Sequence, residues 1–156
     1  MEIKRDRYLR QLIAKKWNGR IKTISGIRRC GKSFLLNKLF VDHLLSEGVT
    51  ETNVIILALD DFANARYRNP MELDAFIRQK TSNRKRRYYI LLDEIQRVET
   101  IKNPYLPADA GQTLGFVDVL LGLLKLPNVD VYVTGSNSRM LSKDIVTDFR
   151  DRGDDV

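Results

Sequence analysis

The sequence predicts an α/β fold in which helices cover both faces of a mostly parallel sheet, and three observations support this. Short apolar or β-branched runs that end in polar residues alternate with longer segments whose apolar residues recur at helical spacing. Strands that alternate with helices are joined by crossover connections, which make the strands parallel. A glycine-rich loop lies between the first strand and the helix that follows it. Parallel sheets bind ligands beyond the carboxyl ends of their strands, which is where the polar motifs of this chain fall.

The individual elements follow from that alternation. We expect strands at 20–25, 53–59, 88–92 and 129–134. We expect helices at about 8–18, at 32–46, from Pro70 onward, at 116–126, and in a last segment up to about Phe149. The run 53–59 is almost entirely apolar, as in a strand covered on both faces. The stretch 102–111 holds two prolines and a glycine and is expected to be a loop.

Composition is typical of a single soluble domain. The chain has 156 residues, of which 43% are hydrophobic and 30% charged. No apolar stretch approaches the roughly 20 residues that span a bilayer, and the charged N-terminus has no apolar signal core behind it. One cysteine cannot form an internal disulfide, so nothing favours secretion. We therefore expect a cytoplasmic protein with no membrane partner.

The formal charge of +7 is unevenly distributed along the chain. Residues 1–22 contain eight Lys or Arg and two acids, whereas residues 93–156 contain seven Lys or Arg and eleven acids. A basic front of this kind allows contact with nucleic acid. A solvated helix face, together with the positive charge that a triphosphate site needs, gives the same pattern. Nucleic acid is therefore a candidate partner that charge alone supports.

The segment 26–33, GIRRCGKS, matches the motif G-x-x-x-x-G-K-[ST]. Its glycines let backbone N–H groups point at phosphate oxygens, and the helix that follows adds the positive end of its dipole. Lys32 is expected to reach the β- and γ-phosphates, and the Ser33 hydroxyl to bind Mg²⁺. The predicted nucleotide-binding residues are Gly26, Ile27, Arg28, Arg29, Cys30, Gly31, Lys32 and Ser33.

The strand predicted at 88–92 ends in two carboxylates, Asp93 and Glu94. Beside a phosphate loop, Asp93 is expected to hold the metal directly or through its water, and Glu94 to polarise the attacking water. An acid pair that caps a helix is the alternative. The adjacent glutamate favours direct hydrolysis of ATP over phosphoryl transfer to a second substrate.

The strand predicted at 129–134 is followed by the polar residues 135–138, GSNS. If this strand lies between the first and third strands, its end falls beside the γ-phosphate. We predict that Asn137 orients the attacking water, with Ser136 as second choice. A turn followed by a helix cap is the alternative.

Together these motifs resemble those of the AAA+ superfamily of P-loop ATPases, with 26–33 as Walker A and YYILLDE (88–94) as Walker B. The closer resemblance is to a family of bacterial and archaeal predicted ATPases that carry a C-terminal domain of unknown function, often likened to a nuclease fold. It covers nearly the whole chain and rests on KRDRYL (4–9), GIRRCGKS (26–33), LDEIQ (92–96), TGSNS (134–138) and LS (141–142).

The resemblance implies a P-loop NTPase sandwich that binds ATP and Mg²⁺ and hydrolyses ATP. Hydrolysis would drive a conformational change in an attached or partner domain, and oligomers are compatible with it. A switch that binds nucleotide without hydrolysing it, or a DNA-binding module, is the alternative. The family usually reads FRGRG where this chain has FRDRG at 149–153, so Asp151 replaces a glycine. Arg152 is the candidate arginine finger, Arg150 is the other choice, and a surface charge cluster is the alternative.

The resemblance also implies five core strands and a small helical lid, whereas we count four strands. Residues 1–156 are therefore predicted to be one AAA+ type ATP-binding core, truncated before the fifth strand and the lid. In such a core Arg20–Ser25 would be an uncovered edge strand, which favours association. We accordingly expect weak nucleotide binding and slow turnover.

Overall fold

A five-stranded parallel sheet forms the centre of the computed structural model, which describes residues 4–25, 35–135 and 146–150. The strand order is β2-β3-β6-β1-β7. The strands are β1 (Ile21–Ser25), β2 (Val54–Ala58), β3 (Tyr88–Asp93), β6 (Val129–Thr134) and β7 (Val146–Arg150). Every neighbouring pair is parallel. The strands therefore all end at one edge of the sheet, called here the carboxyl edge, and all begin at the other, the amino edge.

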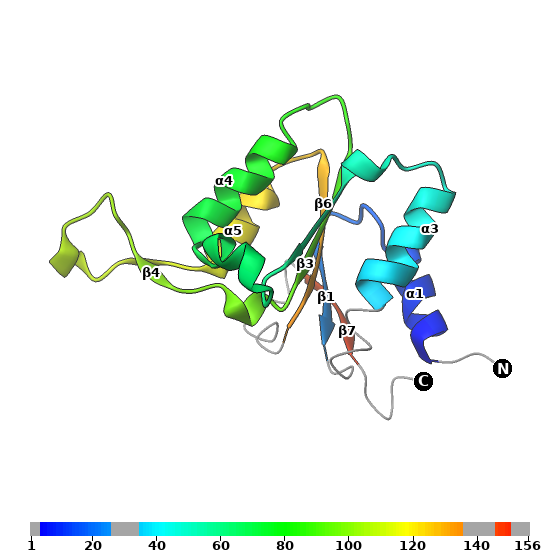
Figure 1. The fold of residues 1–156 in the computed structure, drawn as a ribbon, viewed down its shortest axis with the longest axis horizontal. Coiled ribbons are helices and arrows are strands. Elements are labelled where there is room, and N and C mark those ends of the chain that lie inside the picture. The colour runs from blue at the N-terminus through cyan, green and yellow to red at the C-terminus, as the bar shows by residue number, and fades with distance from the viewer. Residues whose placement is uncertain (1–3, 26–34, 136–145, 151–156) are drawn as a thin grey trace.

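Helices cover both faces of this sheet (Figure 1). One face carries α4 (Pro70–Lys80) and α5 (Phe116–Leu123). The other carries α1 (Lys4–Ala14) and a helix that begins as the π-helix η1 (Leu35–Phe40) and continues as α3 (Val41–Ser46). The predicted three-layer αβα sandwich is thus confirmed. None of the described helices combines the length and apolar character needed to cross a bilayer.

The central strand β3 contributes side chains to the hydrophobic clusters on both faces of the sheet. All six of its residues are buried. Successive side chains of a strand point to opposite faces. Tyr88, Ile90 and Leu92 accordingly join the cluster that includes residues of α4 and α5. Tyr89 and Leu91 join the cluster that includes residues of α1, η1 and α3. Such a strand reads as a continuous apolar run because neither face meets water.

The C-terminal strand β7 corrects two expectations. Residues 146–150 form a strand rather than the end of a helix, and they pair along the whole of β1, with Ile24 opposite Phe149. The strand β1 is therefore covered by a neighbour, and the sheet has five strands instead of four. Whether a segment forms a strand depends on its neighbours in the sheet more than on its own sequence. The prediction that the core stops before a fifth strand is wrong for this reason, whereas the absence of a lid stays a prediction.

The outer strand β2 is less covered than expected. Ile55 and Leu57 are buried, but Ile56 on the opposite face is 43% exposed. The prediction of a strand covered on both faces is wrong at Ile56, because β2 lies at the edge of the sheet where coverage is incomplete. Short 3₁₀ helices at Glu51–Asn53, Phe62–Arg68 and Ile95–Arg97 link the larger elements.

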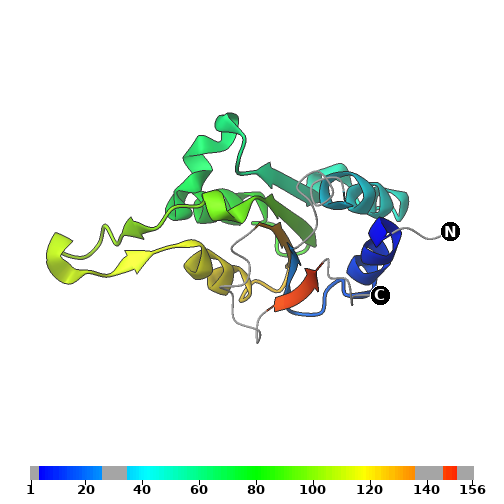
Figure 2. The ribbon, with the colours of Figure 1, turned by 90° about the horizontal axis from the view of Figure 1, so that it is seen from below.

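Between β3 and α5 the chain leaves the body as a long hairpin, residues 98–115, which we call the arm. In it β4 (Ile101–Lys102) pairs antiparallel with β5 (Thr113–Leu114), and a 3₁₀ turn at Ala108–Ala110 forms the far end. Figure 2 shows the arm projecting away from the sheet. Every residue from 104 to 113 is exposed. The predicted loop at 102–111 lies within this hairpin.

Candidate active site

The carboxyl edge brings together the ends of β1, β6 and β3. The strand β6 lies between the other two, as expected, with Ile24 of β1 paired with Thr134 of β6. The strand β1 ends at Ser25, so the predicted phosphate loop follows directly from this edge in the sequence. The loop residues Gly26–Ser33 themselves lie outside the described part of the chain.

The last residue of β6 links this strand to both predicted carboxylates. Asp93 ends β3 and is 4% exposed. The buried hydroxyl of Thr134 donates a hydrogen bond to Oδ1 of Asp93. The same hydroxyl accepts a hydrogen bond from the backbone N–H of Glu94, at 3.0 Å. One side chain of β6 thereby holds both acidic residues in place. The sequence pattern included Thr134 but did not assign it this role.

Glu94 occupies a left-handed backbone conformation, with φ 60° and ψ 55°. For a residue other than glycine this costs on the order of 1–3 kcal/mol, and it persists where the surroundings impose it. Here the hydroxyl of Thr134 holds the backbone N–H. The carboxylate Oε2 accepts a hydrogen bond from Nε2 of Gln96 at 2.8 Å, so the side chain is held as well. The strain is thus located at the residue predicted to polarise water.

Gly135 lets the turn after β3 lie directly against the end of β6. Its φ is +153°, and a Cβ atom there would lie 2.6 Å from Oε1 of Gln96 and 2.8 Å from Cγ1 of Ile95. The backbone nitrogen of Ile95 would be 3.1 Å away. A side chain at this position would therefore displace the turn that carries Glu94. The close approach explains why a glycine follows Thr134.

The donor atoms at this edge suit Mg²⁺. Magnesium prefers oxygen ligands and is usually bound through one or two carboxylates together with substrate phosphates. Asp93, the predicted ligand within the described residues, supplies a buried carboxylate at the end of β3. Ser33, the other predicted ligand, lies outside the described residues.

Other predicted site residues are placed only in part. Asn137, Ser136 and Arg152 lie outside the described residues. Arg150 is the last residue of β7, where its backbone pairs with Ser25 at the end of β1. The structure therefore brings Asp93 and Glu94 together with Thr134.

Known proteins share this sequence pattern. The family model described as "AAA domain" matches residues 18–156. An uncharacterized protein of Haemophilus influenzae is 32% identical over 93% of this chain. An uncharacterized protein of Methanocaldococcus jannaschii is 28% identical over 85% of it. The chain spans 32% and 25% of the lengths of these two relatives.

Two solved structures share the fold. The structure of PCH-2 from C. elegans matches with a TM-score of 0.57 and 13% identity, over 94% of this chain and 42% of the other. That of Drosophila ORC bound to DNA matches with a TM-score of 0.53 and 8% identity, over 94% of this chain and 88% of the other. The chain therefore belongs to the AAA domain family within the AAA+ P-loop ATPases, and its function is of the nucleotide-binding, ATPase-like class.

Proposed function

We propose that this domain binds Mg·ATP at the carboxyl edge and hydrolyses it. The observation that carries the proposal is the linkage of Asp93 and Glu94 to Thr134, at the end of a strand that neighbours β1. The segment that follows β1 has the sequence of a phosphate loop. Phosphoryl transfer depends mainly on positioning and on neutralising charge. Two held carboxylates, at the edge from which a segment with the phosphate-loop sequence follows, would supply both requirements.

In this proposal each residue has a separate task. Lys32 and the backbone of Gly26–Ser33 bind the phosphates, and Ser33 and Asp93 hold Mg²⁺, which neutralises charge on the phosphates when bound. Glu94 accepts the proton of the attacking water, because its carboxylate is held by Gln96 while its backbone is held by Thr134. Asn137 orients the same water, and Arg152 contacts the γ-phosphate in this or a neighbouring subunit.

The domain would act on something beyond itself. Its relatives are about three times its length, since 93% and 85% of this chain span only 32% and 25% of them. We therefore propose that ATP turnover changes the conformation of an attached or partner domain. The arm, which begins a few residues after Glu94, is the described element that leads from this edge into solvent.

Calorimetric titration and a phosphate-release assay on matched variants test the proposal. We expect Lys32→Ala to abolish binding of Mg·ATP. We expect Glu94→Gln to bind with similar affinity and to lose hydrolysis by about 10²-fold or more, as for a lost general base. Glu99→Gln, which removes an exposed acid five residues further on, should change neither property.

Two results would contradict the proposal. Hydrolysis by Glu94→Gln at the parent rate would remove the role of Glu94. Binding of Mg·ATP by the parent without hydrolysis would favour the nucleotide-dependent switch instead. Circular dichroism of each variant separates loss of binding from loss of folding.

A further inference from the structure

The amino edge, opposite the candidate active site, is strongly basic. Four described connections lead into strands there, at 15–20, 47–53, 81–87 and 124–128. They contain eight Lys or Arg residues and two Glu residues. The cations are Lys15, Lys16, Arg20, Arg84, Lys85, Arg86, Arg87 and Lys125, and the acids are Glu47 and Glu51. Both acids precede the outer strand β2, and Glu47 forms an ion pair with Lys16 at 2.6 Å. The other cations of the connections before β1, β3 and β6 have no acidic residue in those connections.

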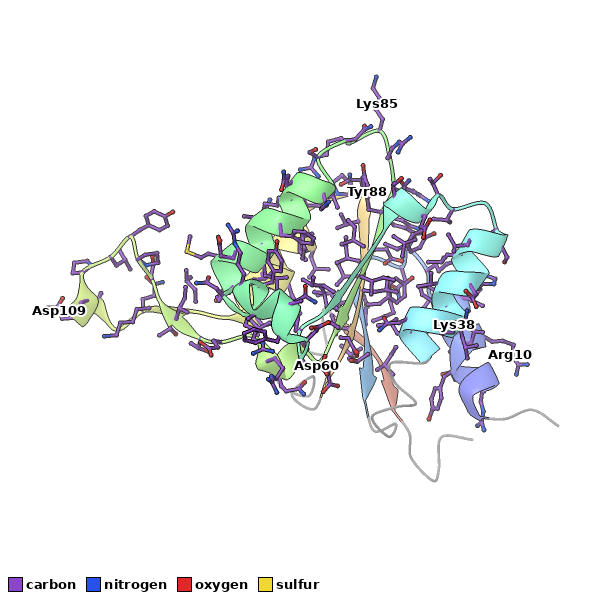
Figure 3. The ribbon with its side chains drawn as sticks, in the orientation of Figure 1. Arg10, Lys38, Asp60, Lys85, Tyr88 and Asp109 are labelled. Atoms are coloured by element: carbon purple, nitrogen blue, oxygen red, sulfur yellow. The ribbon has the colours of Figure 1, made fainter. Side chains whose placement is uncertain are left out.

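Local helix electrostatics do not explain this concentration. Basic side chains are favourable in the last turn of a helix, and in α4 that role belongs to Arg78 and Lys80. The four consecutive cations 84–87 come after the helix has ended. Arg84 is held against the body, its Nη1 donating to Oδ1 of Asn128 at 3.0 Å. Lys85 points away from the body at the tip of the connection (Figure 3).

A pocket of about 220 Å³ opens within this basic edge. Trp17, Arg20, Arg87 and Asp130 line it, together with apolar side chains between residues 123 and 131. The carboxylate of Asp130 adds no free negative charge, because it pairs with the ammonium of Lys22. The guanidinium carbon of Arg87 lies 4.6 Å from the centre of a ring of Trp17. The guanidinium thus covers part of the ring, and the two form one stacked pair at the pocket wall. Proteins stack unpaired nucleobases on aromatic rings and on guanidinium planes, and this pair offers both beside apolar side chains.

The wall formed by Trp17 is held in place by a buried network. The backbone N–H of Trp17 donates to Oδ2 of Asp130 at 2.9 Å, and its indole N–H donates to the hydroxyl of Tyr89 at 3.0 Å. Asp130 is itself 3% exposed and forms an ion pair with the buried ammonium of Lys22. The aromatic wall is therefore positioned before a ligand arrives, which lowers the entropy lost on binding.

We propose that the amino edge binds single-stranded nucleic acid, with phosphates along the basic connections and one base in the pocket. A duplex keeps its bases stacked and so cannot supply one to the pocket. An anionic membrane fits less well, because surface binding relies on exposed apolar side chains. The large apolar side chains that are exposed in the described residues lie outside these four connections. This proposal does not depend on the proposed ATPase activity.

Fluorescence provides a direct test, because Trp17 is the only tryptophan in the chain. We would titrate the 156-residue chain with a labelled thymidine oligonucleotide of about 15 nucleotides, close to known site sizes. Anisotropy should show saturable binding that weakens steeply with salt, and Trp17 emission should be quenched in parallel. Excess Mg·ATP should not displace the oligonucleotide, since the phosphate loop lies at the other edge. Lys32→Ala should bind the oligonucleotide like the parent.

Matched variants locate the contact. Lys85→Ala with Arg86→Ala should reduce the slope of log affinity against log salt by about 1.4, at about 0.7 per phosphate contact. Lys38→Ala with Lys102→Ala removes the same charge from η1 and the arm and should leave the slope unchanged. Trp17→Leu should weaken binding about tenfold or more, and Trp17→Phe much less, because stacking needs an aromatic face.

Several outcomes would overturn the proposal. One is equal affinity for a duplex of the same sequence, and another is unchanged Trp17 emission at saturation. The others are displacement of the oligonucleotide by Mg·ATP and an equal reduction of the salt slope in both double variants. Equal binding to anionic lipid vesicles or to polyglutamate would reduce the edge to a general polyanion surface. If Trp17→Leu does not fold by circular dichroism, the emission of the parent still decides the question.

Discussion

The two edges of the sheet each hold a buried aspartate, and the two aspartates have different partners. At the amino edge, Asp130 binds the ammonium of Lys22 and accepts a hydrogen bond from the hydroxyl of Tyr132 at 2.6 Å. At the carboxyl edge, Asp93 accepts a hydrogen bond from the hydroxyl of Thr134. The fold thus supplies Asp130 with its own cation, whereas Asp93 lies where a bound metal is predicted. The two buried acids therefore differ in how the protein compensates their charge.

The charge of the amino-edge pair is balanced inside the protein. Burial is the main influence on the pKa of Lys22 and lowers it, while the attraction and hydrogen bond of Asp130 oppose that change. The side chain of Lys22 is fully buried, so its charge depends on this one carboxylate for compensation. Removing one partner should accordingly destabilise the fold more than replacing both partners by apolar residues.

The largest expected effect is on Asp130. Replacing it by Ala leaves a buried ammonium without its partner, so we expect Asp130→Ala to lower the free energy of unfolding by about 3–5 kcal/mol. Combining Asp130→Leu with Lys22→Met should restore part of that loss, because no buried charge remains, although the N–H of Trp17 and the hydroxyl of Tyr132 still lack their acceptor. Urea denaturation followed by circular dichroism measures both. Asp109→Ala, at the exposed tip of the arm, is the control and should stay within about 0.5 kcal/mol of the parent. A similar loss in the double variant would contradict the comparison.

A smaller effect is expected at the carboxyl edge. Gly135→Ala places a methyl group against Ile95 and Gln96, so we expect a loss of about 2–3 kcal/mol together with weaker Mg·ATP turnover. Gly111→Ala is the matched control, because Gly111 also has positive φ, +74°, but no atom lies within 4 Å of its added Cβ. It should cost about 1 kcal/mol and leave turnover unchanged. If urea denaturation shows that both variants lose the same free energy of unfolding, backbone strain rather than crowding causes the loss in both.

The smallest expected effect concerns pH. Burial raises the pKa of Tyr132, and the nearby Asp130 raises it further. The folded state then keeps a proton that the unfolded state releases above about pH 10, so the stability from Tyr132 is present below that pH and lost above it. The free energy of unfolding of Tyr132→Phe should fall less steeply between about pH 9 and 11 than that of the parent. Tyr67→Phe is the control, and its free energy of unfolding should fall with pH as steeply as that of the parent. If it falls as gently as that of Tyr132→Phe, Tyr132 is not the residue responsible.

The central strands could be predicted from the sequence because each is a short run of mainly apolar or β-branched residues bounded by polar residues, even though β1 and β6 each contain one charge. The strand β7 could not, since Thr147, Asp148 and Arg150 interrupt its pattern and pairing with β1 determines its conformation. The ion pair of Lys22 and Asp130 was also not predicted. A single charge inside a strand usually indicates a solvent-facing position, and only the register of β1 against β6 brings these two together.

The candidate site could be predicted where it depends on a motif. Asp93 and Glu94 follow from a strand that ends in two acids beside a phosphate-loop sequence. The contribution of Thr134 depends instead on a hydrogen bond between strands forty-one residues apart. The need for Gly135 depends on how closely one turn approaches another strand. Neither feature has a local signal beyond a small polar residue followed by glycine.

The arm has a consequence for how such a domain can change over evolutionary time. Its residues from 104 to 113 are all exposed, so substitutions there remove few buried contacts and should cost little stability. Insertions and deletions at its tip leave both cores and the carboxyl edge untouched. Natural variation can therefore alter the length and chemistry of the arm without altering the machinery from which it extends.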